Sequence, residues 1–586
     1  MSLNLAVSSA VSSLLAIERQ MALASNNISN ANVAGYTNKT ADLATQMSGG
    51  QGTGVGVTGV SSSVDKFLLA DIVAATSTSG QSTTLSNFFN SLQQLLGQVT
   101  SGTSGSDLSS LLTNLSDSLS KLAATPDDPS LKSQVVSDLN QVASALRSTS
   151  AGIQNLRSNA DQEISDQVDD VNNAVKDIKD LNLQIQKAKA AGQPTADLED
   201  QRMDDLQKVA GDIDVNYFID GNGNMQIFTA SNQPLLDSVV HPLSHPTASS
   251  ISAGTSYVPG GSSGISGIQL NGVDITGQIK SGSIKALIDM RDTDLPNAQS
   301  ELDNLASSLS SAINSLANQG TASPPPNSLT GTTNVQATDA VAPAANTVVR
   351  VVLTDSSGKV TGSQDVDISG ATTVQDVLDD LNAVPGVTAS IVNGKLTISG
   401  PSGGGIAIST LSGSIGGKDA SSYFGLNDLI SNGGSASTIA VNSDLLNAAS
   451  LLPTGSLDTS AVPTIGDAAV GASDASIINK LASAMTDKQS FGAAGWLGSA
   501  NSSFSQYAAT LISGIASKAS NADDDATTQQ GTLSTLQGNF SSQSGVNVDE
   551  QTALLTSLQN NYAASAKVIS TVQAMFQSLL TAVQTA

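Results

Sequence analysis

Residues 3–28 read LNLAVSSAVSSLLAIERQMALASNNI and decide how this 586-residue chain folds. Apolar or small side chains recur there in alternating steps of four and three, which places them on one face of an α-helix, as in a heptad repeat. We call this face the N-terminal seam: Leu3, Val7, Ala10, Leu14, Ile17, Met21, Ala24 and Ile28. Between Met1 and Asn38 the only charged residues are Glu18 and Arg19. The stretch therefore predicts an almost uncharged helix with one apolar face.

The other end of the chain shows the same pattern. After Glu550 the only charged residue is Lys567, and a second helix with heptad-like spacing is predicted. Its apolar face, the C-terminal seam, consists of Leu555, Leu558, Tyr562, Ser565, Ile569, Val572, Phe576, Leu579 and Val583.

Two interpretations of these seams are open. An amphipathic helix commonly packs on the core of its own domain. Such a helix carries charges on its solvent face, whereas these two carry Ser, Asn, Gln, Ala and Thr there, which favours a helix surrounded by other protein. We therefore predict that the seams pack against each other and form the interface through which copies of the chain assemble. Because isolated helices are marginal in water, we expect a loose pair that becomes ordered when subunits stack.

The composition excludes several classes of protein. The chain has 24 Lys and Arg against 50 Asp and Glu, a net charge of −26, and no basic cluster, so we expect no nucleic-acid partner. No apolar run approaches the roughly 18 residues of a membrane helix, so no membrane insertion is expected. There is no Cys, which excludes disulfides and thiolate metal sites. No basic residue precedes Arg19, so the N-terminus does not have the pattern of a secretory signal.

Residues 25–37, SNNISNANVAGYT, end the first helix, because Asn and Gly tolerate left-handed backbone conformations. This run resembles the N-terminal signature of the bacterial flagellar axial proteins, which include rod, hook and hook-associated proteins. Ser29 resembles the hook-associated branch, because rod and hook proteins tend to have Ala there. Residues 54–72 and 544–580 also resemble the family. The motif residues are Asn26, Asn27, Ile28, Ser29, Asn30, Gly35 and Tyr36.

Between the two ends the patterns predict an α+β multidomain chain. Helical, coiled-coil-like terminal and stalk domains would have β-rich outer domains inserted between the N- and C-terminal helices. A helix break is expected at residues 125–129, followed by helices over about 130–192 and 196–211, and hairpins around Gly221–Gly223 and Asn393–Gly394. Residues 281–320 resemble the family's strand followed by a helix that returns to the stalk, so a strand is expected at the start of this segment.

Four domains are predicted. They are a terminal helical assembly domain (1–70 with 540–586), a helical stalk (71–215 with 491–539), a β-rich domain ending in a helix that returns to the stalk (216–330), and an outer insert (331–490) with a ββαββ-like unit at 331–430.

Chemical motifs in the sequence are weak. Gly54, Gly56 and Gly59 match a nucleotide-binding spacing, but no helix follows directly. Residues 260–264 match a nucleophile elbow in a Gly/Ser run whose histidines precede it, the reverse of the usual order. His241 and His245 are separated by Pro242, which prevents a helical metal site, and the calcium-loop match at residues 220–231 lacks its required Gly and Glu. We therefore predict no catalytic residues, no metal site, no cofactor and no enzyme.

The family resemblance implies a structural subunit at the junction between the flagellar hook and the filament. It would be secreted by type III export, polymerise into a tubular layer outside the cell, and contact the hook protein and the next hook-associated protein or the filament. A dedicated export chaperone would bind the C-terminal helix. Two alternatives are a hook protein and a secreted β-rich adhesin or peptidase module on an axial-protein scaffold.

Overall fold

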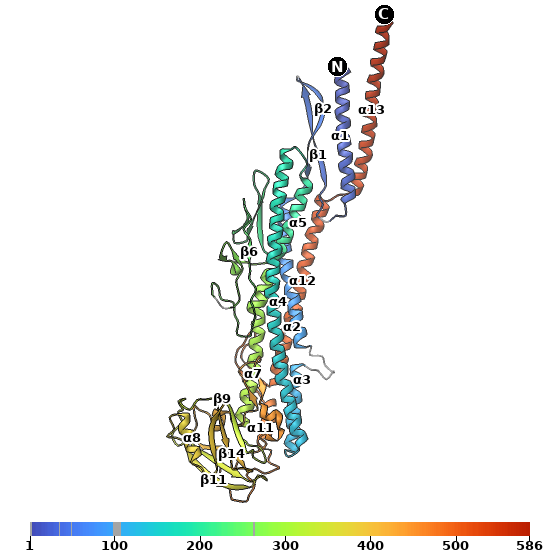
Figure 1. Cartoon of the computed structure of the whole chain (residues 1–586). Coiled ribbons are helices and arrows are strands. Elements are labelled where there is room, and N and C mark those ends of the chain that lie inside the picture. Colours follow the sequence, from blue (N-terminus) through green and yellow to red (C-terminus); the bar gives the residue numbers. More distant parts are fainter. Residues whose placement is uncertain (1–2, 34, 49, 98–106, 262–263, 586) are drawn as a thin grey trace.

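The computed structural model describes residues 3–33, 35–48, 50–97, 107–261 and 264–585. The molecule is elongated, with both termini at one end and a β-rich region of residues 328–412 at the other (Figure 1). Long helices run between these ends. The combination of helices with small antiparallel sheets confirms the predicted α+β class.

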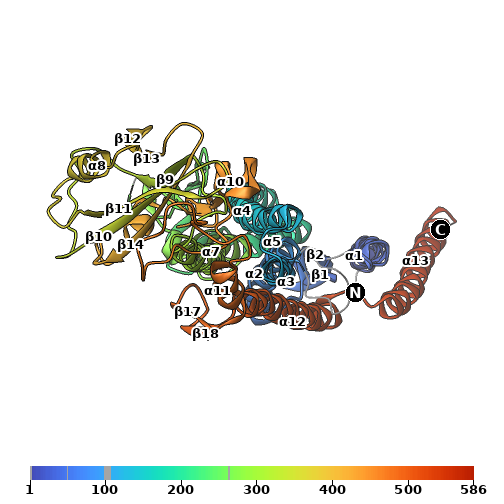
Figure 2. The ribbon, with the colours of Figure 1, turned by 90° about the horizontal axis from the view of Figure 1, so that it is seen from below.

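Two helices and one hairpin form the end that carries the termini. Helix α1 packs along α13, and the hairpin covers another side of α1, so the predicted pairing of the first and last helices is confirmed. Viewed along the long axis, α1 and α13 lie to one side of the central helices and the β-rich region to the other (Figure 2). The elements are α1 (Leu3–Asn30), β1 (Lys39–Ser48), β2 (Gln51–Ser62) and α13 (Val548–Gln584).

Within the described residues, six long helices form a stalk. The predicted break after residue 124 is confirmed: Asp128 caps α4 by accepting hydrogen bonds from the backbone N–H groups of Ser130 and Leu131, and Pro129 occupies the first turn, where its missing N–H costs nothing. Helix α2 packs along α12, and α4 along α3, α5 and α7. The stalk helices are α2 (Lys66–Leu96), α3 (Leu108–Ala124), α4 (Pro129–Ala190), α5 (Ala196–Asp212), α7 (Leu295–Ala317) and α12 (Phe504–Ser544).

Short strands follow α5 along the stalk. The predicted hairpin around Gly221–Gly223 is confirmed: β3 pairs with β4, and Asp220 accepts hydrogen bonds from the backbone N–H groups of Asn222 and Asn224 within the turn. The strands are β3 (Val215–Ile219), β4 (Met225–Thr229), β5 (Pro234–Leu236), β6 (Leu243–Ser244), β7 (Gln269–Leu270) and β8 (Val273–Asp274), followed by the 3₁₀ turn Thr276–Gln278.

The strand expected near residue 284 is wrong. Residues Ser283–Asp289 form helix α6, which continues through a π-helical turn (Met290–Asp294) into α7. Gly282, with φ +93°, starts the helix. Ile284, Leu287 and Ile288 are buried at helical spacing, so packing against the stalk decides the conformation.

The far end contains two three-stranded antiparallel sheets. The predicted order of two strands, one helix and two strands is present, but the first hairpin belongs to the sheet β11-β10-β14 and the second to the sheet β12-β13-β9. Asn393 and Gly394 form the two-residue turn of the second hairpin with positive φ, as expected. The elements are β9 (Ser328–Asn334), β10 (Val348–Thr354), β11 (Val360–Asp367), α8 (Val374–Asn382), β12 (Thr388–Val392), β13 (Lys395–Ser399) and β14 (Gly405–Ser412).

Small elements lead the chain back to the stalk. They are α9 (Ala420–Phe424), β15 (Ile430–Ser431), β16 (Ala440–Val441), α10 (Ser443–Asn447), the 3₁₀ turn Ala449–Leu451, α11 (Ser476–Thr486), β17 (Gln489–Phe491) and β18 (Ala500–Ser502).

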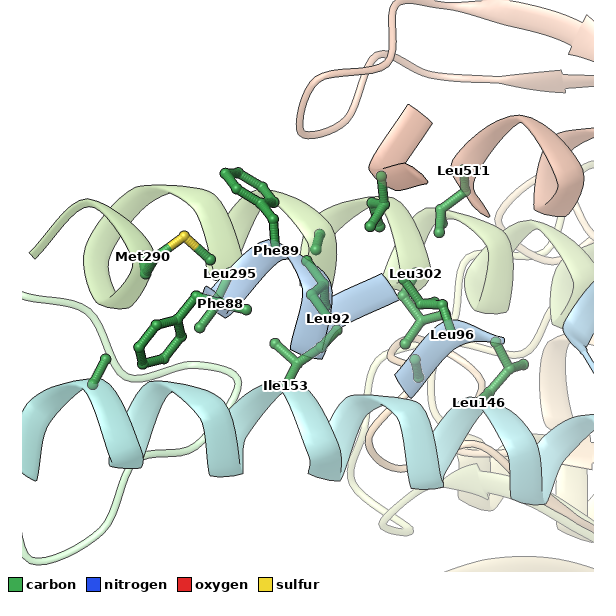
Figure 3. Packing of buried hydrophobic residues seen from close by; sticks show 14 of the residues in the cluster. Phe88, Phe89, Leu92, Leu96, Leu146, Ile153, Met290, Leu295, Leu302 and Leu511 are labelled. Atoms are coloured by element: carbon green, nitrogen blue, oxygen red, sulfur yellow. The ribbon is translucent and has the colours of Figure 1, made fainter. Parts of the chain in front are cut away.

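One continuous hydrophobic core runs through the stalk. In Figure 3, Leu92 of α2, Ile153 of α4 and Leu302 of α7 point into the same layer between the helices. Burying one such side chain stabilises the fold by roughly 1.5–3 kcal/mol. The stalk is therefore held by its own core, independently of the terminal helices.

A buried carboxylate lies in this core. Glu301 of α7 is 1% exposed, and its Oε1 accepts hydrogen bonds from the backbone N–H groups of Trp496 (2.8 Å) and Leu497 (3.1 Å). Burial raises the pKa of Glu301 to about 7, above its ordinary value, although the two N–H groups and Lys518 oppose the shift. A carboxyl whose pKa is higher in the folded than in the unfolded state destabilises the fold once it ionises, so stability falls as pH rises toward 7.

We predict that Glu301→Gln raises the melting temperature at pH 8 and has a much smaller effect at pH 5, because the wild-type carboxyl is already neutral at the lower pH. The gain at pH 8 is at most about 3 kcal/mol. Calorimetry of both proteins at both pH values measures the difference. The matched control is Glu550→Gln at an exposed position, and an equal gain for Glu301→Gln at pH 5 and 8 would contradict the prediction.

Candidate assembly interface

Helices α1 and α13 pack antiparallel in a defined register. The Ser13 and Ser565 hydroxyl oxygens lie 3.4 Å apart, and Asn27 Nδ2 donates to Gln551 Oε1 over 3.1 Å. Both contacts give the same register, in which Leu3 lies level with Met575. The two helices therefore lie side by side along the described length of α1, and each seam contributes buried residues.

The seam residues differ in burial. Those at the centre of the helix pair are buried, and those on its flanks are half-buried. Buried are Ala10, Ile17 and Ala24 of α1 with Leu558 and Val572 of α13; half-buried are Leu3, Val7, Leu14, Met21, Ile28, Leu555, Ser565 and Ile569. Tyr562, Phe576, Leu579 and Val583 are exposed.

The last turns of α13 extend beyond the described start of α1. We call residues 576–584 the overhang. Phe576 is 38%, Leu579 61% and Val583 72% exposed, and Leu580 beside them is 59% exposed. Exposed apolar side chains also lie on the flanks of the helix pair, at Val11, Leu15, Leu554, Val568 and Met575. Within the described chain this apolar surface stays uncovered, which is unusual for a protein that acts as a monomer.

The hairpin β1–β2 approaches α1 closely at one glycine. A Cβ on Gly54, whose φ is +143°, would lie 1.8 Å from Ser12 Oγ, and the same hydroxyl accepts a hydrogen bond from Val55 N–H over 3.2 Å. Gly54, Gly56 and Gly59 all lie within strand β2, and Gly54 allows this strand to pack closely on α1. The nucleotide-binding interpretation of their spacing has no support in this structure.

Asn27 joins the helix pair to the hairpin. It is 1% exposed, and its Nδ2 also donates to Asn38 Oδ1 (2.9 Å) and to the Lys39 carbonyl (2.9 Å). Its Oδ1 accepts from the Lys39 N–H (3.2 Å) and the Tyr36 hydroxyl (3.1 Å). Burial, and next the Asp197 carboxylate, raise the pKa of Tyr36, so this hydroxyl stays protonated and remains a donor.

A second polar cluster joins the hairpin to the stalk. The Lys39 ammonium, whose side chain is 3% exposed, pairs with Asp200 of α5 and donates to the Thr37 carbonyl over 3.0 Å. It also lies 4.1 Å from the centre of the Tyr36 ring, within cation–π range. Gly35 has a φ of +76° and lies close to Asp204: a Cβ at this position would be 2.3 Å from Asp204 Oδ1, so only glycine fits here.

The motif residues thus separate into two groups. Asn27, Gly35 and Tyr36 make the joint, whereas Asn26 and Ser29 are exposed and Ile28 and Asn30 are half-buried on α1. Sequence reasoning missed Asn38, Lys39, Asp200 and Gln551. Gln551 carried one signal, because it lies seven residues before Leu558 and so continues the buried stripe of the C-terminal seam.

The residues of the weaker chemical motifs do not come together in one site. His245 Nε2 lies 3.0 Å from Asp161 Oδ1 in the stalk, whereas His241 Nδ1 contacts Asn271 Oδ1 at 3.3 Å. Ser262 and Ser263 of the elbow-like run lie outside the described residues. Among the described residues no group of three or more His, Asp or Glu is placed to hold a metal ion. None of the described helices has the length and hydropathy of a membrane span.

Comparisons with known proteins find similarity to flagellar proteins. The model of the flagellar hook-associated protein FlgK helical domain matches residues 96–332, and that of the flagellar basal body rod FlgEFG protein C-terminal region matches residues 537–582. The flagellar hook-associated protein 1 of Escherichia coli (strain K12) is 26% identical, and so is that of Salmonella typhimurium (strain LT2); each alignment covers 98% of this chain and 99% of the relative.

A solved structure of the flagellar hook junction protein FlgK from Burkholderia pseudomallei is also similar, at 16% identity and a TM-score of 0.49, covering 80% of this chain and 99% of that one. At that TM-score the identification rests on the sequence matches.

The two family models indicate the class: an axial structural protein of the bacterial flagellum. Within this class, the chain is similar to flagellar hook-associated protein 1 over nearly its full length, which supports a structural role at the hook–filament junction. This agrees with the first function inferred from the sequence and not with the hook-protein alternative.

We predict that Asn27→Ala loosens the joint, because it leaves the Tyr36 hydroxyl, the Lys39 N–H and Gln551 without their buried partner. Each buried polar group that is left without a hydrogen-bond partner lowers the free energy of unfolding by roughly 1–3 kcal/mol. Hydrogen exchange at the Lys39 amide should become faster. Asn26→Ala is the matched control, since Asn26 is exposed beside it; equal exchange in the two variants would contradict the role of Asn27.

We predict that Gly54→Ala separates the hairpin from α1, because the new methyl group occupies the position of the Ser12 hydroxyl. Exchange of the Val55 amide, which donates to that hydroxyl, should rise clearly. Gly52→Ala in the same strand is the control, as nothing lies within 4 Å of its Cβ position. The packing argument fails if both variants exchange at the wild-type rate.

Proposed function

We propose that copies of this chain polymerise through the terminal helix pair to form the layer that joins hook and filament. The observation that carries the proposal is the overhang: four apolar side chains on an uncharged helix end that the described chain leaves exposed. Burying each of them against a neighbouring copy would contribute roughly 1.5–3 kcal/mol. No ion has to be desolvated, because no charged residue follows Lys567.

The charge distribution supports an arrangement in which the terminal helices are buried in the layer and the other regions face outward. The two terminal segments, 1–38 and 551–586, contain only Glu18, Arg19 and Lys567 as charged residues and so carry a net +1, which leaves a net charge of −27 on residues 39–550. We infer that the terminal helices line the inside of a tubular layer and that the acidic regions face the medium. Mutual repulsion there would limit nonspecific association.

The predicted domain division follows from this arrangement. We propose that 1–70 with 540–586 form the assembly domain, that 71–215 with 491–539 form the stalk, and that 216–330 and 331–490 are outer domains inserted between the terminal helices. The packing of α1 with α13 and of α2 with α12 supports this nesting.

The proposed partners are the hook protein on one side and the next hook-associated protein or the filament on the other. Secretion through the flagellar export route would place the protein outside the cell, and an export chaperone would bind the C-terminal helix. The exposed apolar residues of α13 support a chaperone, since an apolar helix face of this kind needs cover before assembly. The role needs no catalysis.

We predict that Leu14→Asp or Phe576→Asp leaves the stalk folded and abolishes filament attachment. Leu14 is half-buried on the helix pair, and Phe576 lies in the overhang, so each new charge would be desolvated much further in the polymer than in the single chain. The test is electron microscopy of cells that lack the chain and are complemented with each variant, with secreted protein measured alongside. Hooks without filaments are expected, with filament subunits in the medium.

Ser534→Asp is the matched control, because it adds the same charge at an exposed position of α12 and should restore filaments. Normal filaments on cells that carry Leu14→Asp and Phe576→Asp at wild-type export levels would overturn the proposed assembly interface.

A further inference from the structure

A groove of about 600 Å³ lies beside the joint between the hairpin and the stalk. This volume is within the range of ligand-binding pockets, roughly 300–1,000 Å³. Elements far apart in the sequence contribute its walls: the first turn of α2, helix α5, strand β3 and the end of α12. Its apolar lining includes Val64, Phe67, Leu69, Met203, Phe218 and Phe540.

Aromatic side chains in this groove are exposed to solvent. Phe67 is 86% exposed and Phe218 is 49% exposed, although Phe218 stacks on Phe228 with ring centres 5.6 Å apart. Charged side chains also line the groove. Asp200 pairs with Lys39 and Glu199 with Lys189, Arg202 donates to Asn182 Oδ1 over 2.8 Å, and Lys66 and Asp204 complete the set. The groove therefore offers an apolar surface beside these charged groups.

The overhang has a complementary pattern. Phe576, Leu579, Leu580 and Val583 stand at positions i, i+3, i+4 and i+7 of one helix, the spacing by which an amphipathic helix lies in an apolar groove. No charged residue accompanies them after Lys567.

The chain cannot fill its own groove with its own overhang. Thr37 lines the groove, and the adjacent Asn38 donates its N–H to the Ser544 carbonyl at the end of α12, where α13 is about to begin. From Val548 to Gln577, α13 then leads away by roughly 1.5 Å per residue, or about 45 Å. The occupant must come from another molecule.

We propose that the groove at Phe67 and Phe218 binds the overhang of a second copy of this chain. The inference rests on the proposed polymerisation and specifies its contact. Because groove and overhang lie at opposite ends of the same terminal region, the contact is head-to-tail. A head-to-tail contact leaves a free groove and a free overhang after every addition, so it propagates, whereas a self-complementary contact would stop at a dimer.

The experiment uses the absence of Cys in the chain, which makes introduced thiols the only ones. The variant Lys66→Cys/Gln577→Cys places one thiol at the exposed rim of the groove and one at the flank of the overhang, both at exposed polar positions. Treating isolated flagella with a short bifunctional thiol reagent should give a ladder of cross-linked multimers. Each single variant should give none, and Gln577→Cys with Val392→Cys, on the distant β12, should also give none.

Adding Phe67→Asp to the double variant should abolish the ladder in full-length protein, whereas adding Val239→Asp, at an equally exposed apolar residue outside the groove, should not. Assembled flagella without a ladder, or a ladder that Phe67→Asp leaves unchanged, would overturn the groove contact and leave the proposed function standing. If charged variants of the seams still attach filaments, the proposed function fails instead.

Discussion

The incomplete burial of the terminal helix pair is the constraint on which the remaining structure depends. Helices α1 and α13 bury one stripe of small and apolar side chains between them and leave a second apolar surface on their flanks and on the overhang. Charged side chains, which would make that surface soluble, are nearly absent. In the proposed assembly, neighbouring copies would cover this surface. The stalk, by contrast, has a continuous core of its own, so its packing does not depend on that cover.

The joint between these two parts is polar, and its central residues Asn27 and Lys39 are buried. Asn27 of α1 hydrogen-bonds with the hairpin and with α13 at once, and the Lys39–Asp200 pair ties the hairpin to α5. Buried networks of this kind fix one geometry, because any other leaves polar groups unpaired. A defined angle between assembly end and stalk would let each subunit present its outer domains in the same orientation. The groove lies beside this joint, so the proposed contact between copies would form at the place where the angle between the assembly end and the stalk is fixed.

Local chemistry predicted much of the fold. The helix break at residues 125–129 and the turn at Asn393–Gly394 depend on residues adjacent in sequence, and the structure has them as expected. The strand expected at the start of α6 rests on the family resemblance, whereas Ile284, Leu287 and Ile288 are buried at helical spacing, so packing on the stalk decides the conformation. The pairing of the two terminal helices could be predicted from the sequence, but the exposure of individual residues could not. Val572 and Phe576 occupy similar positions in the C-terminal seam. The register that the Asn27–Gln551 contact marks leaves Val572 buried and Phe576 exposed. The groove was unpredictable, since its walls come from four separate elements.

Hydroxyl-radical footprinting of the free chain and of the same chain in isolated flagella tests the central claim most directly. The account predicts that Leu579, Leu580 and Val583, exposed in the single chain, become strongly protected in the flagellum. Val392 of the outer sheets, 48% exposed, serves as the internal reference. Equal modification of the overhang in both states, with the reference unchanged, would show that these helices face water in the polymer and would contradict the account.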